Sequence, residues 1–232
     1  MRVLNFALNP ELEELRSRAA KVAADGVEKF GRFTDSWMNG YSSEFSEIMA
    51  SEGWIGMSWP KEHGGQERSA IERVIVGEEM ISAGAPIAGM WFADRQMGPS
   101  LISHGTLEQQ EKYLPGILSG KATWCIGMSE PDSGSDLASL KTFAENDGDQ
   151  WVINGQKIWT SGAQSADWCY LICRTDLEAP PHKGMSEFIV DMKSPGIDIK
   201  PIKDASGDSH FNEVFFNDVL VPGENLVGEL NN

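Results

Sequence analysis

The chain has 232 residues, with 19 Lys and Arg against 35 Asp and Glu, which gives a formal net charge of −16. A chain of this length can bury a hydrophobic core as one large or two small domains. Its negative charge disfavours a nucleic acid backbone or an anionic membrane surface as a partner. No apolar run approaches the about 20 residues that span a bilayer, and the N-terminal stretch MRVLNFALNPELEELRSRAA lacks a secretory leader pattern. We therefore expect a cytoplasmic protein without membrane insertion.

The cysteines and histidines show no metal-ligand spacing, so we expect no metal site. Cys169 and Cys173 lie in the strand-like stretch DWCYLICR. On one strand they would share a face about 13 Å apart, which is too far for a disulfide. We predict buried free thiols for the cysteines.

The first part of the chain has the apolar spacing of helices. Asn9 can cap a helix that Pro10 begins and that extends to about Phe30. Apolar residues at 45–49 and at 71–75 predict a second and a third helix. Each of these helices is amphipathic, so one face of each is expected to be buried.

Two further helices complete the predicted bundle. One covers residues 86–103 and is interrupted near Gly98-Pro99, because proline disturbs a helix interior. Thr106 and Gln109 form a capping box that begins the other. Residues 1–120 are therefore predicted to form an all-α helical bundle.

From about Lys121 the apolar pattern changes to a period of two, which is typical of strands. Asn154-Gly155 is a dipeptide typical of a hairpin turn. The strand candidates are ATWCIGMSE, QWVINGQKIWT, DWCYLICR, EFIVDM, IDIKPI and NEVFFNDV. Residues 121–232 are thus predicted to form a β-barrel or sandwich, and the whole chain belongs to the α+β class.

The decapeptide MSEPDSGSDL, residues 128–137, combines hydroxyls, carboxylates and a tight turn, and it admits three interpretations. Residues 127–131 come close to the nucleophile elbow of a serine hydrolase, with proline in place of the last glycine. A second interpretation is a loop whose Ser and Asp side chains bond their own backbone. The third is a cradle of backbone N–H groups and hydroxyls for a flavin and its pyrophosphate.

A family resemblance favours the cradle. The stretches WCIGMSEPDSGSDLASLKT and WVINGQKIWTSGAQSADWCYLICRTD closely resemble the middle domain of the acyl-CoA dehydrogenase family. GWIGMSWPKEHGG, GPSLISHGTLEQQEKYLPGILSGKATW, GMSEFIVDMKSPGI and FNEVFFNDVLVPGENLVGE resemble further family segments in the same order. The resemblance covers the N-terminal helical and middle β domains, and we expect the family's C-terminal helical bundle to be absent.

The resemblance implies FAD as the cofactor of the 121–232 domain. It places the Ser129 hydroxyl at the pyrimidine end of the isoalloxazine, Trp159 against the ring system and the Ser161 hydroxyl near N5. Position 161 is commonly Thr in the family, and Ser keeps the hydroxyl. Taken singly, Trp159 also fits a core aromatic and Ser161 a strand-end cap. The implied FAD-binding residues are Ile126, Met128, Ser129, Gly134, Ser135, Trp159, Thr160 and Ser161.

The resemblance also implies an acyl-CoA pocket. Ser135 would face the FAD pyrophosphate or the bound acyl-CoA, and apolar residues on an inner helix also fit a core role. The run APIAGMWFADRQMGPSL resembles actinobacterial members, some of which take bulky or steroid-derived acyl chains. The implied substrate-contacting residues are Ser135, Met90, Trp91, Phe92 and Gln96.

The implied activity is α,β-dehydrogenation of an acyl-CoA thioester, in which a carboxylate removes the α proton and hydride passes to FAD. Electrons then leave to an electron-transfer flavoprotein. In most members the carboxylate is a glutamate of the C-terminal bundle, so the catalytic base remains unassigned. Acids of the decapeptide would lie beside the cofactor, and the first alternatives to test are Glu78, Glu79 and Asp94.

Three hypotheses remain open. The first is an acyl-CoA dehydrogenase present as a truncated chain or split-enzyme subunit, inactive alone and part of a homo- or hetero-oligomer. The second is a non-catalytic flavin- or acyl-CoA-binding partner subunit. The third is a serine hydrolase with Ser129 as the nucleophile.

Overall fold

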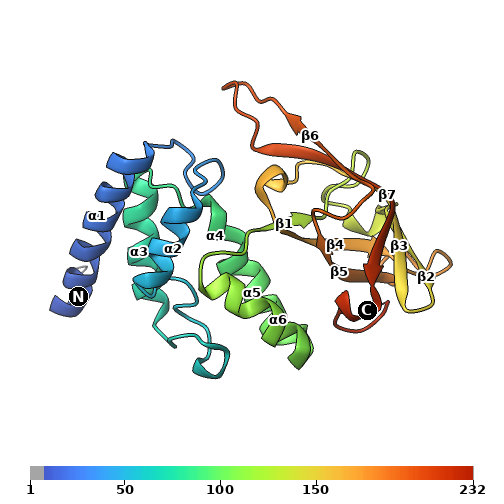
Figure 1. The fold of residues 1–232 in the computed structure, drawn as a ribbon, viewed down its shortest axis with the longest axis horizontal. Coiled ribbons are helices and arrows are strands. Elements are labelled where there is room, and N and C mark those ends of the chain that lie inside the picture. Colours follow the sequence, from blue (N-terminus) through green and yellow to red (C-terminus); the bar gives the residue numbers. More distant parts are fainter. Residues whose placement is uncertain (1–7, 232) are drawn as a thin grey trace, which may run out of the picture.

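The computed structural model describes residues 8–231 of the chain. A helical half and a β half lie side by side (Figure 1). The N-terminal stretch that was expected to lack a secretory leader begins with residues 1–7, which lie outside the described part. Among the described residues, no helix is long and apolar enough to cross a bilayer.

The helical half follows the order expected from the sequence. The first helix begins at Pro10 with the Asn9 side chain accepting a hydrogen bond from the Leu12 N–H at 2.9 Å, and the capping box of Thr106 and Gln109 is present. Both predictions are confirmed. The helices are α1 (Pro10–Phe30), α2 (Ser43–Ser51), α3 (Ala70–Ala83), α4 (Ala88–Phe92), α5 (Gly98–His104) and α6 (Leu107–Leu118), with a 3-10 turn η1 (Lys61–His63).

The predicted fourth helix is present as α4 and α5, joined by a π-helical turn η2 (Ala93–Met97) directly before Gly98-Pro99. Gly98 must be small, because a Cβ there would lie 1.9 Å from the Trp59 ring. A π turn adds a residue to the helical turn and so changes which side chains face the interior.

The β half is a mostly antiparallel eight-stranded sheet with the order β6-β7-β3-β2-β4-β5-β8, and β1 pairs in parallel with β4. The predicted α+β class is confirmed. β2 and β8 were not predicted, because one is polar and the other is only two residues long. The strands are β1 (Trp124–Gly127), β2 (Phe143–Asp147), β3 (Gln150–Lys157), β4 (Trp168–Arg174), β5 (Met185–Asp191), β6 (Ile197–Ile202), β7 (Phe211–Pro222) and β8 (Leu226–Val227), with 3-10 turns η3 (Leu137–Ser139), η4 (Ala163–Ser165) and η5 (Gly223–Asn225).

The predicted hairpin turn at Asn154-Gly155 is wrong. Both residues lie inside β3, where the register with β7 shifts between Ile153 and Gly155 in a β-bulge. Gly155 has a φ of 147°, and a Cβ would lie 2.4 Å from the Thr142 hydroxyl, so glycine here serves the bulge. The β2–β3 turn instead contains Gly148, with a φ of 69°.

The two halves share one core. Trp124, Tyr170, Ile189 and Val227 of the sheet belong to the same buried apolar cluster as the helices. Gln109 of α6 is buried, and its side-chain amide donates hydrogen bonds of 2.7 Å to the carbonyl oxygens of both Glu224 and Leu226. These contacts hold α6 against the segment that follows β7.

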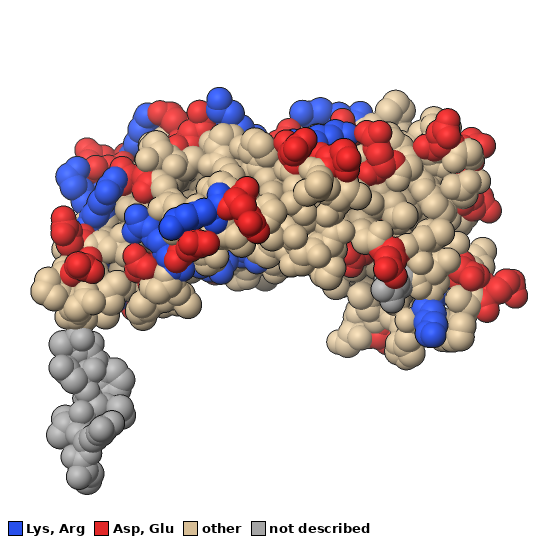
Figure 2. All heavy atoms as spheres, turned by 90° about the horizontal axis from the view of Figure 1, so that it is seen from below, with Lys and Arg blue, Asp and Glu red and all other residues tan. Residues whose placement is uncertain are grey.

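The surface carries mixed charge, and the cysteines agree with the prediction from the sequence. On the face shown in Figure 2, basic side chains lie among acidic ones and form no continuous basic surface. Cys125, Cys169 and Cys173 are buried and free, which confirms the predicted thiols. Within residues 8–231 no group of three His, Cys, Asp or Glu side chains is placed to hold a metal ion.

We predict that Gln109→Ala lowers the free energy of unfolding by about 2 kcal/mol, because it removes the side-chain donor of two hydrogen bonds, to the carbonyl oxygens of Glu224 and Leu226. Urea denaturation followed by circular dichroism measures the change. Glu111→Ala, at an exposed position of the same helix, is the matched control and should leave the midpoint within experimental error. Equal midpoints for the two variants would contradict the prediction.

Candidate functional site

A hollow of about 280 Å³ lies between the helical half and one end of the sheet. Its walls come from the α4–η2 region, from the end of β1 and from the segment that follows β3. The lining residues are Phe92, Gln96, Ile126, Met128, Ser129, Ile158, Trp159 and Ser161. None of these residues, all within the described part of the chain, is charged. The hollow thus combines apolar and aromatic walls with two hydroxyls and one amide.

A second hollow, of about 270 Å³, shares Phe92 and Ser161 with the first. It extends along the segment between α1 and α2, where Phe33, Met38 and Tyr41 line it. The two hollows form adjoining space at the junction of the two halves.

Trp159 has a left-handed backbone conformation and a largely exposed side chain. Its φ is 60°, in the left-handed region that bulky residues rarely adopt, and 56% of its surface is exposed. Its ring contacts Phe211 edge-on, with the centroids 5.8 Å apart. Strained residues of this kind concentrate at binding and catalytic sites. A large aromatic side chain is thus held at the edge of an uncharged hollow.

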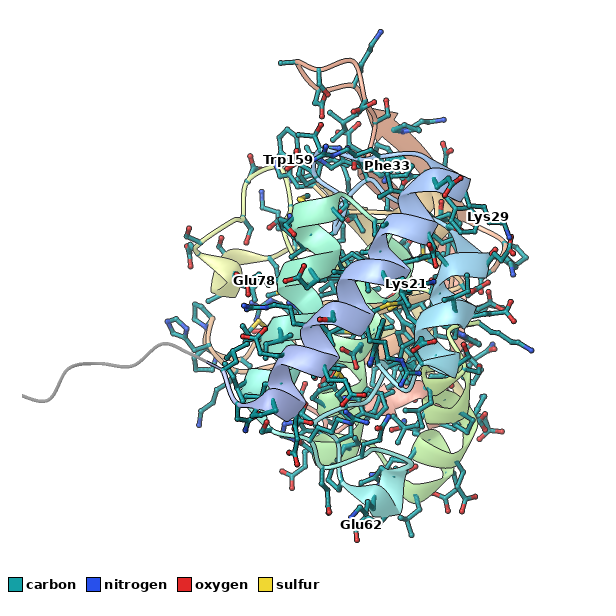
Figure 3. The ribbon with its side chains drawn as sticks, turned by 90° about the vertical axis from the view of Figure 1, so that its left-hand side faces the viewer. Lys21, Lys29, Phe33, Glu62, Glu78 and Trp159 are labelled. Carbon is teal, nitrogen blue, oxygen red and sulfur yellow. The ribbon has the colours of Figure 1, made fainter. Side chains whose placement is uncertain are left out.

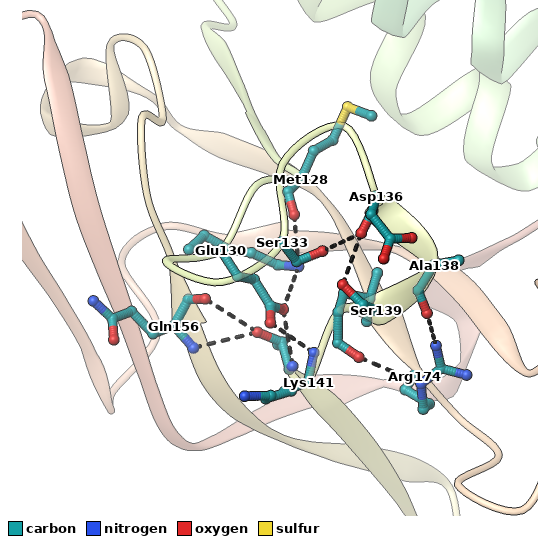
Figure 4. A network of polar contacts seen from close by, with 12 residues as sticks. Met128, Glu130, Ser133, Asp136, Ala138, Ser139, Lys141, Gln156 and Arg174 are labelled. Carbon is teal, nitrogen blue, oxygen red and sulfur yellow. Dashed lines mark hydrogen bonds and ion pairs between the residues drawn. The ribbon is translucent and has the colours of Figure 1, made fainter. Parts of the chain in front are cut away.

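A buried ion pair lies directly behind this wall. The Lys157 ammonium is 2.9 Å from a carboxylate oxygen of Glu130, and the two side chains are 0% and 6% exposed. Lys157 also donates a hydrogen bond of 3.0 Å to the Met128 carbonyl oxygen. The Glu130 carboxylate accepts two further hydrogen bonds, at 2.6 Å from the Lys141 N–H and at 2.9 Å from the Thr142 N–H. Figure 4 shows this network.

The pKa of each side chain in the ion pair differs from its ordinary value. Burial opposes ionisation of Glu130, but the Lys157 ammonium and the N–H groups of Lys141 and Thr142 outweigh it, and the pKa of Glu130 is lowered. Burial also lowers the pKa of Lys157, and the Glu130 carboxylate partly offsets that effect. The lowered pKa keeps the Glu130 carboxylate ionised at neutral pH.

The loop between β1 and β2 is held at several further points. Glu130 and Ser133 exchange backbone hydrogen bonds across a tight turn, and the Ser133 hydroxyl donates to the Asp136 carbonyl oxygen at 2.7 Å. The Arg174 guanidinium donates to the Ala138 carbonyl oxygen, also at 2.7 Å. Figure 4 shows the bonds of Ser133 to Asp136 and of Arg174 to Ala138. These hydrogen bonds fix the conformation of the loop.

The structure gathers most of the predicted site residues in the hollow. Seven of them line it, together with Ile158, which was not predicted. The predicted residues found there are Phe92, Gln96, Ile126, Met128, Ser129, Trp159 and Ser161. Three segments far apart in the sequence therefore meet at one place.

Five predicted residues lie outside the lining. Met90 is buried in the core, and the Trp91 ring packs against the Trp37 ring with their centroids 5.6 Å apart. Gly134 and Ser135 are exposed in the loop beyond the hollow. Thr160 is buried, and its backbone exchanges two hydrogen bonds of 3.0 Å with Asn212. The helical phase of α4 explains the first two positions, and the left-handed turn at residue 159 directs residue 160 inward.

The alternative catalytic bases do not line the hollow. The Asp94 carboxylate is buried and accepts a hydrogen bond of 2.7 Å from the Gly56 N–H. Glu78 and Glu79 pair with Arg16 between α3 and α1, at 3.0 and 3.3 Å, on the face that Figure 3 shows. All three carboxylates are therefore paired with groups outside the hollow.

The nucleophile elbow finds no support in the loop geometry. β1 leads into the turn of Glu130 and Ser133 and then into the three-residue turn η3, not into an α-helix. An elbow requires a strand, a sharp turn and a helix. The Ser129 carbonyl oxygen instead accepts a hydrogen bond of 2.8 Å from the Ile158 N–H, which joins two walls of the hollow.

Neither Glu130 nor Lys157 was among the predicted site residues. One signal was available. Lys157 is in phase with Trp151 and Ile153, which face the core in β3, so the period of two places a lysine on the apolar face. A buried lysine requires an acidic partner, and that requirement could have directed attention to Glu130.

Two family models match the chain. Residues 9–121 match the model described as acyl-CoA dehydrogenase, N-terminal domain, and residues 125–219 match acyl-CoA dehydrogenase, middle domain. The chain is 44% identical over 184 residues to acyl-CoA dehydrogenase IpdE1 of Mycobacterium tuberculosis, an alignment that covers 79% of this chain and 48% of that protein. The chain spans about half the length of the curated relatives it matches.

Solved structures show the same fold. A chain of a structure described as "Tcur3481-Tcur3483 steroid ACAD" superposes with a TM-score of 0.89 at 39% identity, over 98% of this chain and 59% of that one. A chain of the ChsE4-ChsE5 complex from Mycobacterium tuberculosis superposes with a TM-score of 0.86 at 35% identity, over 98% of this chain and 59% of that one.

We predict that the parent chain has a higher free energy of unfolding than Glu130→Gln at neutral pH, and that this difference becomes smaller as the pH falls below about 4.5. The pKa of Glu130 is lowered in the folded chain, so its stabilising contribution is complete above the ordinary pKa and is lost as the pH falls through the folded value. Glutamine does not titrate, so the variant lacks this loss. Urea unfolding at a series of pH values from 7 to 3 measures the difference.

Asp132→Asn is the matched control for this series. Asp132 lies in the same loop, and its ion pair with Lys141 is exposed. Its stability difference from the parent should be small at every pH. A difference for Glu130→Gln that stays constant down to pH 3 would contradict the prediction.

Proposed function

This chain belongs to the acyl-CoA dehydrogenase family, and from that membership we propose that it supplies the flavin- and thioester-binding part of an enzyme that dehydrogenates an acyl-CoA between the α and β carbons. The observation that carries the proposal is Trp159, strained and exposed beside the hollow. Strained backbone of this kind clusters at binding sites, which supports a ligand at this surface.

The hollow suits an isoalloxazine ring in its chemistry. The ring is planar and aromatic, with carbonyl and N–H groups along one edge. Ile126, Ile158 and Trp159 offer apolar and aromatic surface, and the hydroxyls of Ser129 and Ser161 offer hydrogen bonds. We propose that these residues hold FAD, which would accept the hydride when bound. Donors beside the ring stabilise negative charge that develops on it.

We propose that Gly134 and Ser135 contact the FAD pyrophosphate or the acyl-CoA, since both are exposed on the loop that continues from Ser129 of the hollow. Phe92 and Gln96 line the side that the helical half contributes. We assign them to the acyl chain. Met90 and Trp91 support that wall from behind.

The catalytic base is proposed to come from outside residues 8–231. No carboxylate lines the hollow, and the three alternative acids are engaged elsewhere. A general base must reach the proton that it removes. We therefore propose a homo- or hetero-oligomer in which a further helical domain, in the same protein or in a partner chain, completes the site.

The proposed function also suggests which acyl groups the enzyme takes and which protein accepts its electrons. One structural neighbour is described as a steroid ACAD, so steroid-derived thioesters stand beside short and long fatty acyl-CoA as candidates. An electron-transfer flavoprotein is the proposed acceptor. A second candidate function is a non-catalytic flavin- or acyl-CoA-binding subunit, which the missing carboxylate favours.

We predict that Trp159→Ala weakens FAD binding by about 1 to 3 kcal/mol, or about 5- to 150-fold, because it removes a stacking surface. The free energy of unfolding should stay nearly unchanged, since the side chain is largely exposed. Flavin fluorescence quenching measures the affinity. Leu220→Ala removes an equally exposed apolar side chain, 52% against 56%, from β7 and should bind FAD as the parent does. Parental affinity in Trp159→Ala would refute this placement of the flavin.

We predict that the isolated chain, loaded with FAD, shows no more than trace acyl-CoA dehydrogenation, because no base faces the hollow. The assay is anaerobic bleaching of the flavin absorption band with short, long and steroid-derived thioesters. Adding the helical domain that carries the base, in cis or as a partner, should restore bleaching. Rapid bleaching by the chain alone would contradict the prediction. FAD that stays bound but is not bleached after that addition would favour the non-catalytic subunit.

A further inference from the structure

We propose that the buried ion pair of Glu130 and Lys157 is a positioning device for the candidate flavin site, which fixes the Met128-Ser129 wall of the hollow against the Trp159-Ser161 wall. The inference rests on the proposed function, because it names residues that act on the flavin only through their neighbours. Neither side chain lines the hollow. They are therefore positioning residues and not catalytic ones.

Glu130 and Lys157 are close in sequence to the residues that form the two walls of the hollow. Glu130 directly follows Ser129 on one wall, and Lys157 ends β3 two residues before Trp159 on the other. The Lys157 ammonium joins the walls twice, at 2.9 Å to the Glu130 carboxylate and at 3.0 Å to the Met128 carbonyl oxygen. The Ile158 N–H adds a third bond, at 2.8 Å to the Ser129 carbonyl oxygen. A shift of either charge would therefore move residues that face the hollow.

Stability alone does not account for the pair. Removing two charges from water is unfavourable, and well-packed apolar residues often replace a buried ion pair without loss of stability. What an apolar pair does not provide is a directional bond to the Met128 carbonyl oxygen. The exposed ion pair of Asp132 and Lys141, on the same loop at 3.1 Å with side chains 78% and 75% exposed, lacks this property. Geometry is thus the specific contribution of the buried pair.

The test is the double variant Glu130→Gln/Lys157→Met in the full chain. Glutamine keeps a carbonyl acceptor for the Thr142 N–H, and methionine keeps an unbranched side chain of similar length, so the variant leaves no unpaired buried charge. We expect FAD affinity to fall about tenfold or more, since small misplacements in a binding site have effects of this order. We also expect a shifted absorption band and reduction potential for the flavin that still binds.

Two controls separate positioning from stability. Asp132→Asn/Lys141→Met removes the exposed pair from the same loop and should bind FAD with the parental affinity and spectrum. Gln109→Ala destabilises the fold at a distance from the hollow and should leave the spectrum and potential of bound flavin unchanged. A double variant with the FAD affinity and flavin spectrum of the parent would overturn the inference. The inference would also fail if Gln109→Ala, at the same free energy of unfolding, showed the same changes in affinity and spectrum as the double variant.

Hydrogen–deuterium exchange distinguishes failure of this inference from failure of the proposed function. The exchange of the Ile158 amide, which bonds to Ser129, should accelerate in the double variant and not in the exposed-pair control. If the parent chain binds no FAD, the proposed function fails, and the exchange result alone decides whether the pair positions the walls. Unchanged exchange in the double variant would then overturn the inference.

Discussion

The burial of the Lys157 ammonium is the constraint on which the site depends. A lysine on the apolar face of a sheet is tolerated only with an opposite charge and hydrogen-bond acceptors, and Glu130 and the Met128 carbonyl oxygen provide them. Glu130 in turn accepts the backbone N–H groups of Lys141 and Thr142, at the far end of the loop. One ion pair therefore closes the loop from 128 to 142 and holds it on β3.

The same constraint makes the conformation of Trp159 tolerable. A left-handed tryptophan persists only where its neighbours fix the chain on both sides. Ile158 bonds to Ser129 on one side, and Thr160 exchanges two hydrogen bonds with Asn212 on the other. These hydrogen bonds, two between backbone groups and one from the Asn212 side-chain amide, offset the strain, and the ring remains available at the hollow.

The hollow exists because the two halves pack as one body. Core residues from the helices and from the sheet form a single cluster, so the walls from α4–η2 and from β1 keep a fixed separation. The π turn η2 directs Asp94 to the Gly56 backbone, while Gln96 lines the hollow. No carboxylate lines this hollow, which is why the proposed activity requires a further domain.

The sequence by itself determined whatever depends on near neighbours in the chain. The caps at Asn9 and Thr106, the change from helical to strand period near residue 121, the free cysteines and the family were all predictable, because each is encoded in a short stretch. Tertiary packing decided the rest. Asn154-Gly155 became a bulge, because the Thr142 side chain and β7 lie against it. The partner of Lys157 lies 27 residues away in the chain, and no local pattern specifies which carboxylate a buried ammonium meets.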